Sequence, residues 1–261
     1  MGSSTDRPGV PGYGPGLKGM EENRMIPGIF VTGTGTDVGK TITVAGLMRR
    51  LLRHGVDAMM MKPVQTGAYL DATGHATAPD IDFVLQATGL TVDDKTMHHL
   101  APYLYEPACS PHLAARLAGR PIRLEVILES ARVLAERHRL LVVEGAGGLM
   151  VPLNESETML DLAAVMSMPV LLVGHSGLGT INHVLLSLEA LRSRNLKILG
   201  VILNDTRSVA EHDRFIYDDN LHAIQSFGNI RVLARIPWLG APPDTDLLDR
   251  ALGAWDLHKE L

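Results

Sequence analysis

The glycine-rich stretch 33–41 is the part of the sequence whose residue types and spacing most clearly indicate chemistry. It reads Gly-Thr-Gly-Thr-Asp-Val-Gly-Lys-Thr and lies between the apolar run 28–31 and a helical pattern. Backbone N–H groups of such a loop can turn towards one anion, and the helix that follows presents its positive end to the same anion. Lys40 adds a positive charge, and Thr41 adds a hydroxyl suited to Mg²⁺. The stretch therefore predicts a cradle for nucleotide phosphates, although its first glycine lies one residue earlier than in the standard pattern.

Lys62 is the second candidate for a functional residue, because it follows the apolar run 56–61, which is a predicted buried strand. A lysine at the end of a strand is ordinarily solvated. Here the neighbouring residues Gln65-Thr66-Gly67 add a hydroxyl and a flexible backbone. Together these groups suit the binding of an anion in a transition state. Both interpretations of Lys62 stay open at this point.

Three carboxylates are candidates for a metal site. Glu144 follows the apolar run 140–143, so it is placed to hold Mg²⁺, or alternatively to cap the glycine-rich turn that follows. Asp80 and Asp82 both begin a predicted helix. Each of them either caps that helix or completes the metal shell.

Asn204 and Asp205 follow another apolar run, 198–203. Asn204 can offer both a donor and an acceptor to the edge of a base, whereas we expect Asp205 to cap or stabilise a turn. We expect packing or loop roles for three histidines that lack metal-ligand spacing, and a buried position for the single cysteine: His112, His175, His183 and Cys109.

Alternating strand and helix patterns position these side chains. Strands are predicted at 28–31, 56–61, 140–143, 170–173, 198–203 and 232–236, and helices at 42–54, 80–88, 112–118, 124–137, 159–166, 182–194 and 211–226. Irregular loops are expected at 69–79, 102–111 and 175–180. The alternation indicates a single-domain α/β fold with a mostly parallel sheet and helices on both faces. Because ligands of such sheets bind at the carboxyl ends of the strands, one edge is expected to hold the stretch 33–41, Lys62, Glu144, the loop 175–180 and Asn204.

Composition limits the classes of function. The chain has 261 residues, of which 46% are hydrophobic, enough for a sizeable core. Its formal charge of -5 gives no general attraction to nucleic acid or to an anionic membrane, so neither is expected as a partner. With one cysteine and neither a spanning stretch nor a signal-peptide layout, we expect a soluble cytoplasmic protein. Segment 1–24, rich in glycine and proline, is expected to be a flexible leader, with Met20 and Met25 as alternative natural starts.

Six motifs resemble those of the dethiobiotin synthetases and stand in that family's order. They are Gly33-x5-Gly39-Lys40-Thr41, Lys62-Pro63-Val64-x-Thr66-Gly67, Pro107-x-x-Ser110-Pro111-His112, Glu144-Gly145-Ala146-Gly147-Gly148, Gly177-Leu178-Gly179-x-Ile181-Asn182-His183 and Ile236-Pro237-Trp238-Leu239. They cover about residues 26 to 240, and the early first glycine matches the family's own loop length. The resemblance implies a P-loop NTPase fold, with an ATP-dependent ligase domain over residues 25–261.

The same resemblance implies an ATP- and Mg²⁺-dependent cyclo-ligase of biotin synthesis. Its substrates would be carbon dioxide and the diamine 7,8-diaminopelargonic acid. The family reaction forms a carbamate, phosphorylates it with ATP, and closes the ureido ring through the second amine with loss of phosphate. Relatives of this kind are homodimers, so the resemblance also implies a substrate site at a dimer interface.

Matching positions in the motifs imply roles for individual residues. The nucleotide would be bound by Asp37, Val38, Gly39, Lys40, Thr41, Ile42, Asp80, Glu144, Gly145, Ala146 and Gly147, with Asn204, Asp205, Pro237, Trp238 and Leu239 around the adenine. Mg²⁺ would be held by Thr41, Asp80 and Glu144, with Asp82 as the alternative to Asp80. The catalytic residues would be Lys62, which stabilises carbamate and phosphoryl oxygens, Lys40 and Thr36. The substrate would contact Thr36, Lys62, Thr66, Gly147 and, across the dimer, Gly179, Thr180 and Asn182.

Two other classes of protein compete with this interpretation. A regulatory ATPase of the partition and septum-positioning kind normally carries an extra lysine five residues before the invariant one, where this chain has Gly35. An amidotransferase-type cyclic-diamide synthetase needs a glutaminase domain with a nucleophilic cysteine, and the stretch after Leu239 is too short to contain one. The sequence therefore favours the ligase over both alternatives.

Overall fold

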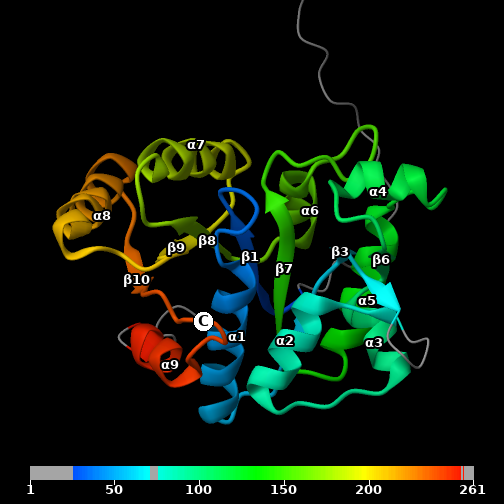
Figure 1. The fold of residues 1–261 in the computed structure, drawn as a ribbon. Helices are drawn as coiled ribbons and strands as arrows, with labels where there is room; N and C mark the ends of the chain where they lie inside the picture. The colour runs from blue at the N-terminus through cyan, green and yellow to red at the C-terminus, as the bar shows by residue number, and fades with distance from the viewer. Residues whose placement is uncertain (1–25, 71–75, 254, 256–261) are drawn as a thin grey trace, which may run out of the picture.

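The computed structural model describes residues 26–70, 76–253 and 255 (Figure 1). The leader predicted at 1–24 lies outside these residues. Within them, the central sheet has six parallel strands in the order β10-β9-β8-β1-β7-β2. The strands are β1 (Gly28–Gly33), β2 (Ala58–Met61), β7 (Leu140–Gly148), β8 (Val170–His175), β9 (Ile198–Asn204) and β10 (Val232–Ile236). The predicted α/β class with a mostly parallel sheet is confirmed.

Strand β1 lies inside the sheet, and all six of its residues are buried. Phe30 pairs with Val143 of β7 on one side and with Val170 of β8 on the other. A strand covered on both faces needs a continuous apolar run instead of an alternating one, and β1 meets that need. Because all these strands are parallel, the segments that leave their carboxyl ends meet at one edge of the sheet.

Helices cover both faces of the sheet, and Figure 1 shows α7 and α8 above it and α1, α2 and α9 below it in that view. The bounds are α1 (Lys40–Arg53), α2 (Pro79–Thr88), α3 (Asp94–Leu100), α4 (Pro111–Leu117), α5 (Leu124–Ala135), α6 (Met159–Met166), α7 (Thr180–Ser193), α8 (Arg214–Gly228) after a 3₁₀ turn (Glu211–Asp213), and α9 (Thr245–Gly253). Helix α1 buries Val44, Leu47, Met48 and Leu51 at helical spacing. None of the helices in the described ranges combines the length and apolar character needed to cross a membrane.

Several predicted boundaries are wrong, and three of them bear on the candidate site. Strand β7 continues to Gly148, so Glu144 lies within the strand and not at its end. The glycines after Glu144 break the apolar pattern, but their backbone still pairs with β1, as Gly33 with Gly148 shows. Strand β8 likewise includes His175, which was expected in a loop. Helix α7 begins at Thr180, because Gly179 is its N-cap with φ of 92°.

The predicted loops 69–79 and 102–111 contain short strands. In the second loop, β6 (Tyr103–Tyr105) pairs in parallel with β3 (Val64–Thr66), which places Thr66 on a strand. In the first, β4 (Tyr69–Leu70) pairs with β5 (Ala76–Thr77). Strands of two or three residues are too short to show a hydrophobic period. Helices α3 and α9 were not predicted, so the expectation that the last helix lies at 211–226 is also wrong.

Candidate active site

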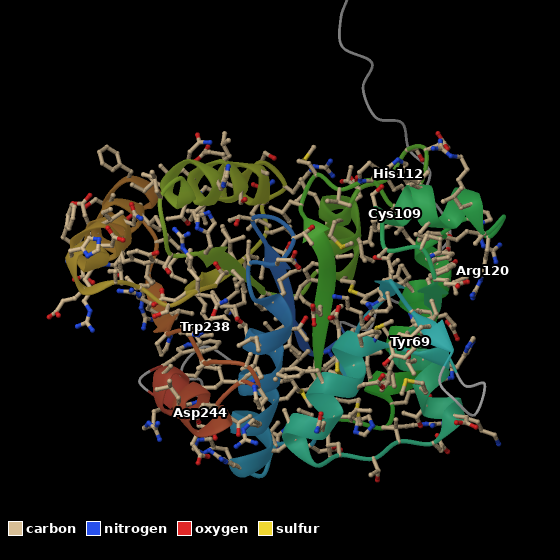
Figure 2. The ribbon with its side chains drawn as sticks, in the orientation of Figure 1. Tyr69, Cys109, His112, Arg120, Trp238 and Asp244 are labelled. Atoms are coloured by element: carbon tan, nitrogen blue, oxygen red, sulfur yellow. The ribbon has the colours of Figure 1, made fainter. Side chains whose placement is uncertain are left out.

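A cavity of about 1040 Å³ opens at the carboxyl edge of the sheet. Its lining includes these predicted site residues: Thr36, Asp37, Gly39, Lys40, Thr41, Ile42, Lys62, Thr66, Asp80, Glu144, Ala146, Gly147, Asn204, Asp205, Trp238 and Leu239. Figure 2 shows Trp238 and Cys109, which both line the cavity, on opposite sides of β7 and α1. The fold thus brings together residues from six separate parts of the sequence.

The loop between β1 and α1 has a backbone geometry suited to a phosphate site. Gly39 is the N-cap of α1 with φ of 95°, and Asp37 also has a positive φ of 57°. Among the described residues no side chain caps α1, and the first turn of this helix contains no acidic residue. Lys40 Nζ donates to the carbonyl oxygen of Gly35 at 2.7 Å, so its ammonium folds back over the loop. The uncapped N–H groups and this ammonium together suit a bound phosphate chain.

Lys62 lies at the centre of the predicted metal residues. Its Nζ is 2.6 Å from Asp80 Oδ2 and 2.6 Å from Glu144 Oε1, and Thr41 Oγ1 donates to the same Glu144 oxygen at 2.8 Å. Strand β2 ends just before Lys62, β7 carries Glu144, and the first turn of α2 carries Asp80. Asp82, the alternative to Asp80, does not line the cavity. The geometry therefore favours Asp80 over Asp82 as a member of the site.

The donor set of this cluster fits a divalent cation. The Glu144 side chain is buried, and its Oε2 has no hydrogen-bond partner within the described part of the chain. Two carboxylates and a hydroxyl are oxygen ligands of the kind that Mg²⁺ prefers. A buried carboxylate oxygen without a partner is costly unless a cation or a donor reaches it, so Glu144 is suited to bind one.

The two lysines of the site have opposite pKa shifts. Burial lowers the pKa of Lys62, but the negative charges of Glu144 and Asp80 outweigh burial, and the net pKa is raised. Burial, and then the positive charge of Lys62, lower the pKa of Lys40 to about 8. Lys62 therefore stays protonated at neutral pH, whereas Lys40 is close to its titration range.

The last residue of β9, the residues that follow it and residues 238–243 after β10 also line the cavity. Asn204 is 7% exposed, and a Cβ added at Gly39 would overlap its side-chain amide. Asp205 is bound to Arg235, with Nε to Oδ1 at 2.9 Å and Nη2 to Oδ2 at 3.0 Å, and it accepts a hydrogen bond from Ser176. Asp205 thus binds residues of other segments, whereas the Asn204 amide lies against Gly39 of the phosphate loop.

Some predicted site residues do not line this cavity. Val38, Gly145 and Pro237 are absent from its lining. Gly179, Thr180 and Asn182 lie at the start of α7, outside the cavity, where Thr180 is fully buried and the other two are exposed. The loop that was expected to join the site instead borders a smaller hollow of about 260 Å³, lined by residues 175–178, 206, 207 and 217.

The cavity also contains residues that the sequence did not assign to it, and Gln65 and Gly67, which were expected to help Lys62 bind an anion. The unassigned residues are Val64, Pro79, Ala108, Cys109, Ser110, Pro111, Val151, Thr206 and the run 240–243. Gln65 is 5% exposed, and its Oε1 has no partner among the described residues. Cys109 is half-buried at the cavity wall, so its expected burial is wrong. The Pro107 to His112 motif contains Cys109, Ser110 and Pro111, so it could have indicated this side of the cavity.

Comparison with known proteins decides the family. A family model described as an AAA domain matches residues 27–241. A protein of Anaeromyxobacter dehalogenans strain 2CP-C, named ATP-dependent dethiobiotin synthetase BioD, is 41% identical over 227 residues, which are 87% of this chain and 96% of that protein. The chain belongs to the dethiobiotin synthetase family. A Clostridium kluyveri protein of the same name is 33% identical over 240 residues, 90% of this chain and 94% of its own length. As a member of this family the chain is an ATP-dependent ligase.

A solved structure outside the dethiobiotin synthetase family shares this fold. The solved MinC:MinD cell division protein complex of Aquifex aeolicus has a TM-score of 0.52 and 12% identity, and the match covers 86% of each chain. A likeness at that identity shows only a shared fold. It gives the regulatory ATPase alternative no support, whereas the synthetases match at 33% and 41% identity over most of the chain.

Proposed function

We propose that the chain converts 7,8-diaminopelargonic acid, carbon dioxide and ATP into dethiobiotin, ADP and phosphate. One observation carries this proposal: a single cavity holds the uncapped start of α1, the buried ammonium of Lys62 and the hydroxyl of Thr66. The start of α1 suits a triphosphate, the Lys62 ammonium suits an anion formed during the reaction, and the Thr66 hydroxyl suits an amine substrate.

Mg²⁺ belongs to the proposal, with Thr41, Asp80 and Glu144 as its ligands. The unpartnered Oε2 of Glu144 and the hydroxyl of Thr41 beside Oε1 support this assignment. When bound, the ion would offset the negative charge of the transferring phosphoryl group. Lys40 would offset further charge from the phosphate loop.

The proposed reaction has three bond-forming steps. An amine nitrogen of the diamine attacks carbon dioxide, forms a carbon–nitrogen bond and releases a proton. A carbamate oxygen then attacks the γ-phosphorus of ATP, and the bond to the ADP oxygen breaks. Finally the second amine attacks the carbamate carbon, the bond to the phosphate oxygen breaks, and another proton leaves. Lys62 would stabilise the anionic oxygens, because its raised pKa keeps it charged.

Substrate placement extends the proposal beyond a single subunit. Thr36, Thr66 and Gly147 would contact the reacting end of the diamine. The uncapped start of α7, at Gly179, Thr180 and Asn182, would bind its distant carboxylate from the partner subunit of a homodimer. The single cysteine of the sequence supports a cytoplasmic setting for the reaction.

The direct test supplies purified protein with ¹³C-bicarbonate, Mg²⁺, ATP and the diamine. The expected result is a ring-closed product that carries the heavy carbon, with ATP hydrolysis that depends on the diamine. ATP hydrolysis that ignores the diamine and responds to DNA or lipid vesicles would instead support a regulatory ATPase.

A further inference from the structure

Three arginines near the end of α1 bind helix α9. Arg49 makes a two-pronged ion pair with Asp249, with Nε to Oδ1 at 3.0 Å and Nη2 to Oδ2 at 2.7 Å. Arg53 reaches the same carboxylate at 2.6 Å, and Arg50 donates to the carbonyl oxygen of Leu252 at 3.0 Å. The Arg49 and Asp249 side chains are only 17% and 12% exposed, so solvent screens this pair less than an ordinary surface pair.

Apolar packing also brings α1 and α9 close together. Leu248 and Leu252 of α9 are buried. They pack over Gly46 of α1, where an added Cβ would lie 3.0 Å from Leu248 Cδ1. The absence of a side chain at Gly46 therefore allows the close approach that the Arg49–Asp249 pair requires.

Helix α9 is joined directly to one side of the cavity, residues 238–243, here named the wall segment. Asp244 directly follows the wall segment and bonds to both of its neighbours in the chain. Its N–H donates to the carbonyl oxygen of Leu239 at 2.8 Å. Its Oδ1 accepts from the N–H groups of Asp246 and Leu247 at 2.9 Å each. Figure 2 shows Trp238 and Asp244 beside α1, on the same side of it as α9. A shift of α9 therefore moves the wall segment with it.

Arg49 also contacts the helix that carries Asp80. Its Nη1 donates to the carbonyl oxygen of Ala87, in the last turn of α2. One guanidinium thus joins three helices. Helices α1 and α2 contribute residues to the cavity lining, and α9 follows the wall segment. Arg49 itself does not line the cavity, so it can act on a ligand only through these segments.

We propose that Arg49 and Asp249 are positioning residues for the nucleotide, because their ion pair fixes α9 on α1 and thereby holds the wall segment over the phosphate loop. The inference rests on the nucleotide half of the proposed function and is independent of the diamine. Failure of ring closure would leave it unaffected, since it concerns only the binding of a nucleoside phosphate in the cavity.

The test uses the full chain with Asp249→Asn, Arg49→Met and Arg53→Met. Calorimetry gives the dissociation constant of ADP, steady-state kinetics give kcat and both KM values, and hydrogen exchange reports on residues 245–253. We expect Asp249→Asn and Arg49→Met to weaken ADP binding and raise the KM for ATP about tenfold, with kcat and the diamine KM within about twofold of the parent. Arg53→Met, which keeps the Arg49 pair and removes a 56% exposed side chain, should weaken ADP binding less than about twofold.

The matched control is Arg194→Met, which breaks a 2.7 Å ion pair with Asp161; neither residue lines the cavity. It should lower the melting temperature without changing ADP affinity. The proposal is overturned if Asp249→Asn loosens α9 in hydrogen exchange while ADP affinity stays unchanged. It is also overturned if Arg194→Met weakens ADP binding as much as Arg49→Met does, because a general loss of stability would then explain both.

Discussion

Lys62 Nζ and Glu144 Oε1 lie 2.6 Å apart inside the cavity, although 82 positions separate these residues in the chain. Both side chains are almost completely buried, and Glu144 keeps a second oxygen without a partner among the described residues. A buried ion pair of this kind is costly to form, so it is weak evidence for a role in stability alone. Its position beside the phosphate loop makes it the centre of the proposed chemistry.

Replacement of Lys62 by Met should separate nucleotide binding from turnover. We expect ADP affinity to change less than about threefold and kcat to fall by at least about a hundredfold, since the variant loses charge that acts mainly in the transition state. Lys197→Met, at an exposed lysine, is the control and should retain full activity. Normal product formation by Lys62→Met would remove this residue from the mechanism.

The lowered pKa of Lys40 predicts proton uptake when nucleotide binds. At pH 8 about half of the Lys40 side chains are neutral, because burial and the charge of Lys62 lower the pKa to about 8. Bound phosphate favours the ammonium, so the pKa rises on binding and affinity falls as the pH increases through 8. Calorimetry of ADP binding in buffers of different ionisation enthalpy should detect up to about half a proton taken up at pH 8, and much less at pH 6.5.

The control for this experiment is Lys40→Arg, which remains charged at every pH used. Proton uptake at pH 8 should disappear in that variant. Equal uptake by the parent and Lys40→Arg would assign the titration to another group.

Gly39 should be essential for nucleotide binding and not only for helix stability. A Cβ there would overlap the amide of Asn204, and its φ of 95° disfavours other residues. We expect Gly39→Ala to abolish measurable ADP binding. Gly55→Ala is a matched control, because Gly55 has φ of 72° and no described residue lies near its Cβ position. It should cost about 1–3 kcal/mol of unfolding free energy and leave ADP binding intact. Loss of ADP binding in both variants would point to general destabilisation.

The proposed dimer site predicts that two inactive variants complement each other. Lys62→Met removes the catalytic ammonium, and Asn182→Asp places a repelling charge where the substrate carboxylate would bind at the start of α7. If each site combines both elements from different subunits, random mixed dimers contain one intact site, and about a quarter of the parent activity returns. Mixtures that stay inactive after subunit exchange, verified by mass, would indicate that each site lies within one subunit.

The sequence predicted well which residues lie at the carboxyl edge of the sheet, because residues that follow parallel strands all come to that edge. Lys62 follows β2 as predicted, and the phosphate loop joins β1 to α1. Glu144 was also placed correctly in space, although β7 continues beyond it. In each case a local pattern of apolar residues carried the information.

Contacts between distant segments could not be predicted in the same way. Arg49 and Asp249 are 200 positions apart, and neither stands next to a motif. Helix α9 was missed because its buried face has only a few apolar residues, Leu248 and Leu252 among them. Gln65 lay within a motif at a position that the motif leaves open, so its burial gave no sequence signal. Such relationships depend on packing and not on local periodicity.

The most direct test of the central claim follows oxygen atoms during a single turnover. Protein with Mg²⁺, ATP and the diamine is mixed with C¹⁸O₂ in unlabelled water and quenched before the label exchanges. If a carbamate oxygen attacks ATP in the cavity beside Lys62, each phosphate released should carry one ¹⁸O and each product molecule another in its ureido carbonyl. Phosphate without ¹⁸O, formed together with labelled product, would contradict the account.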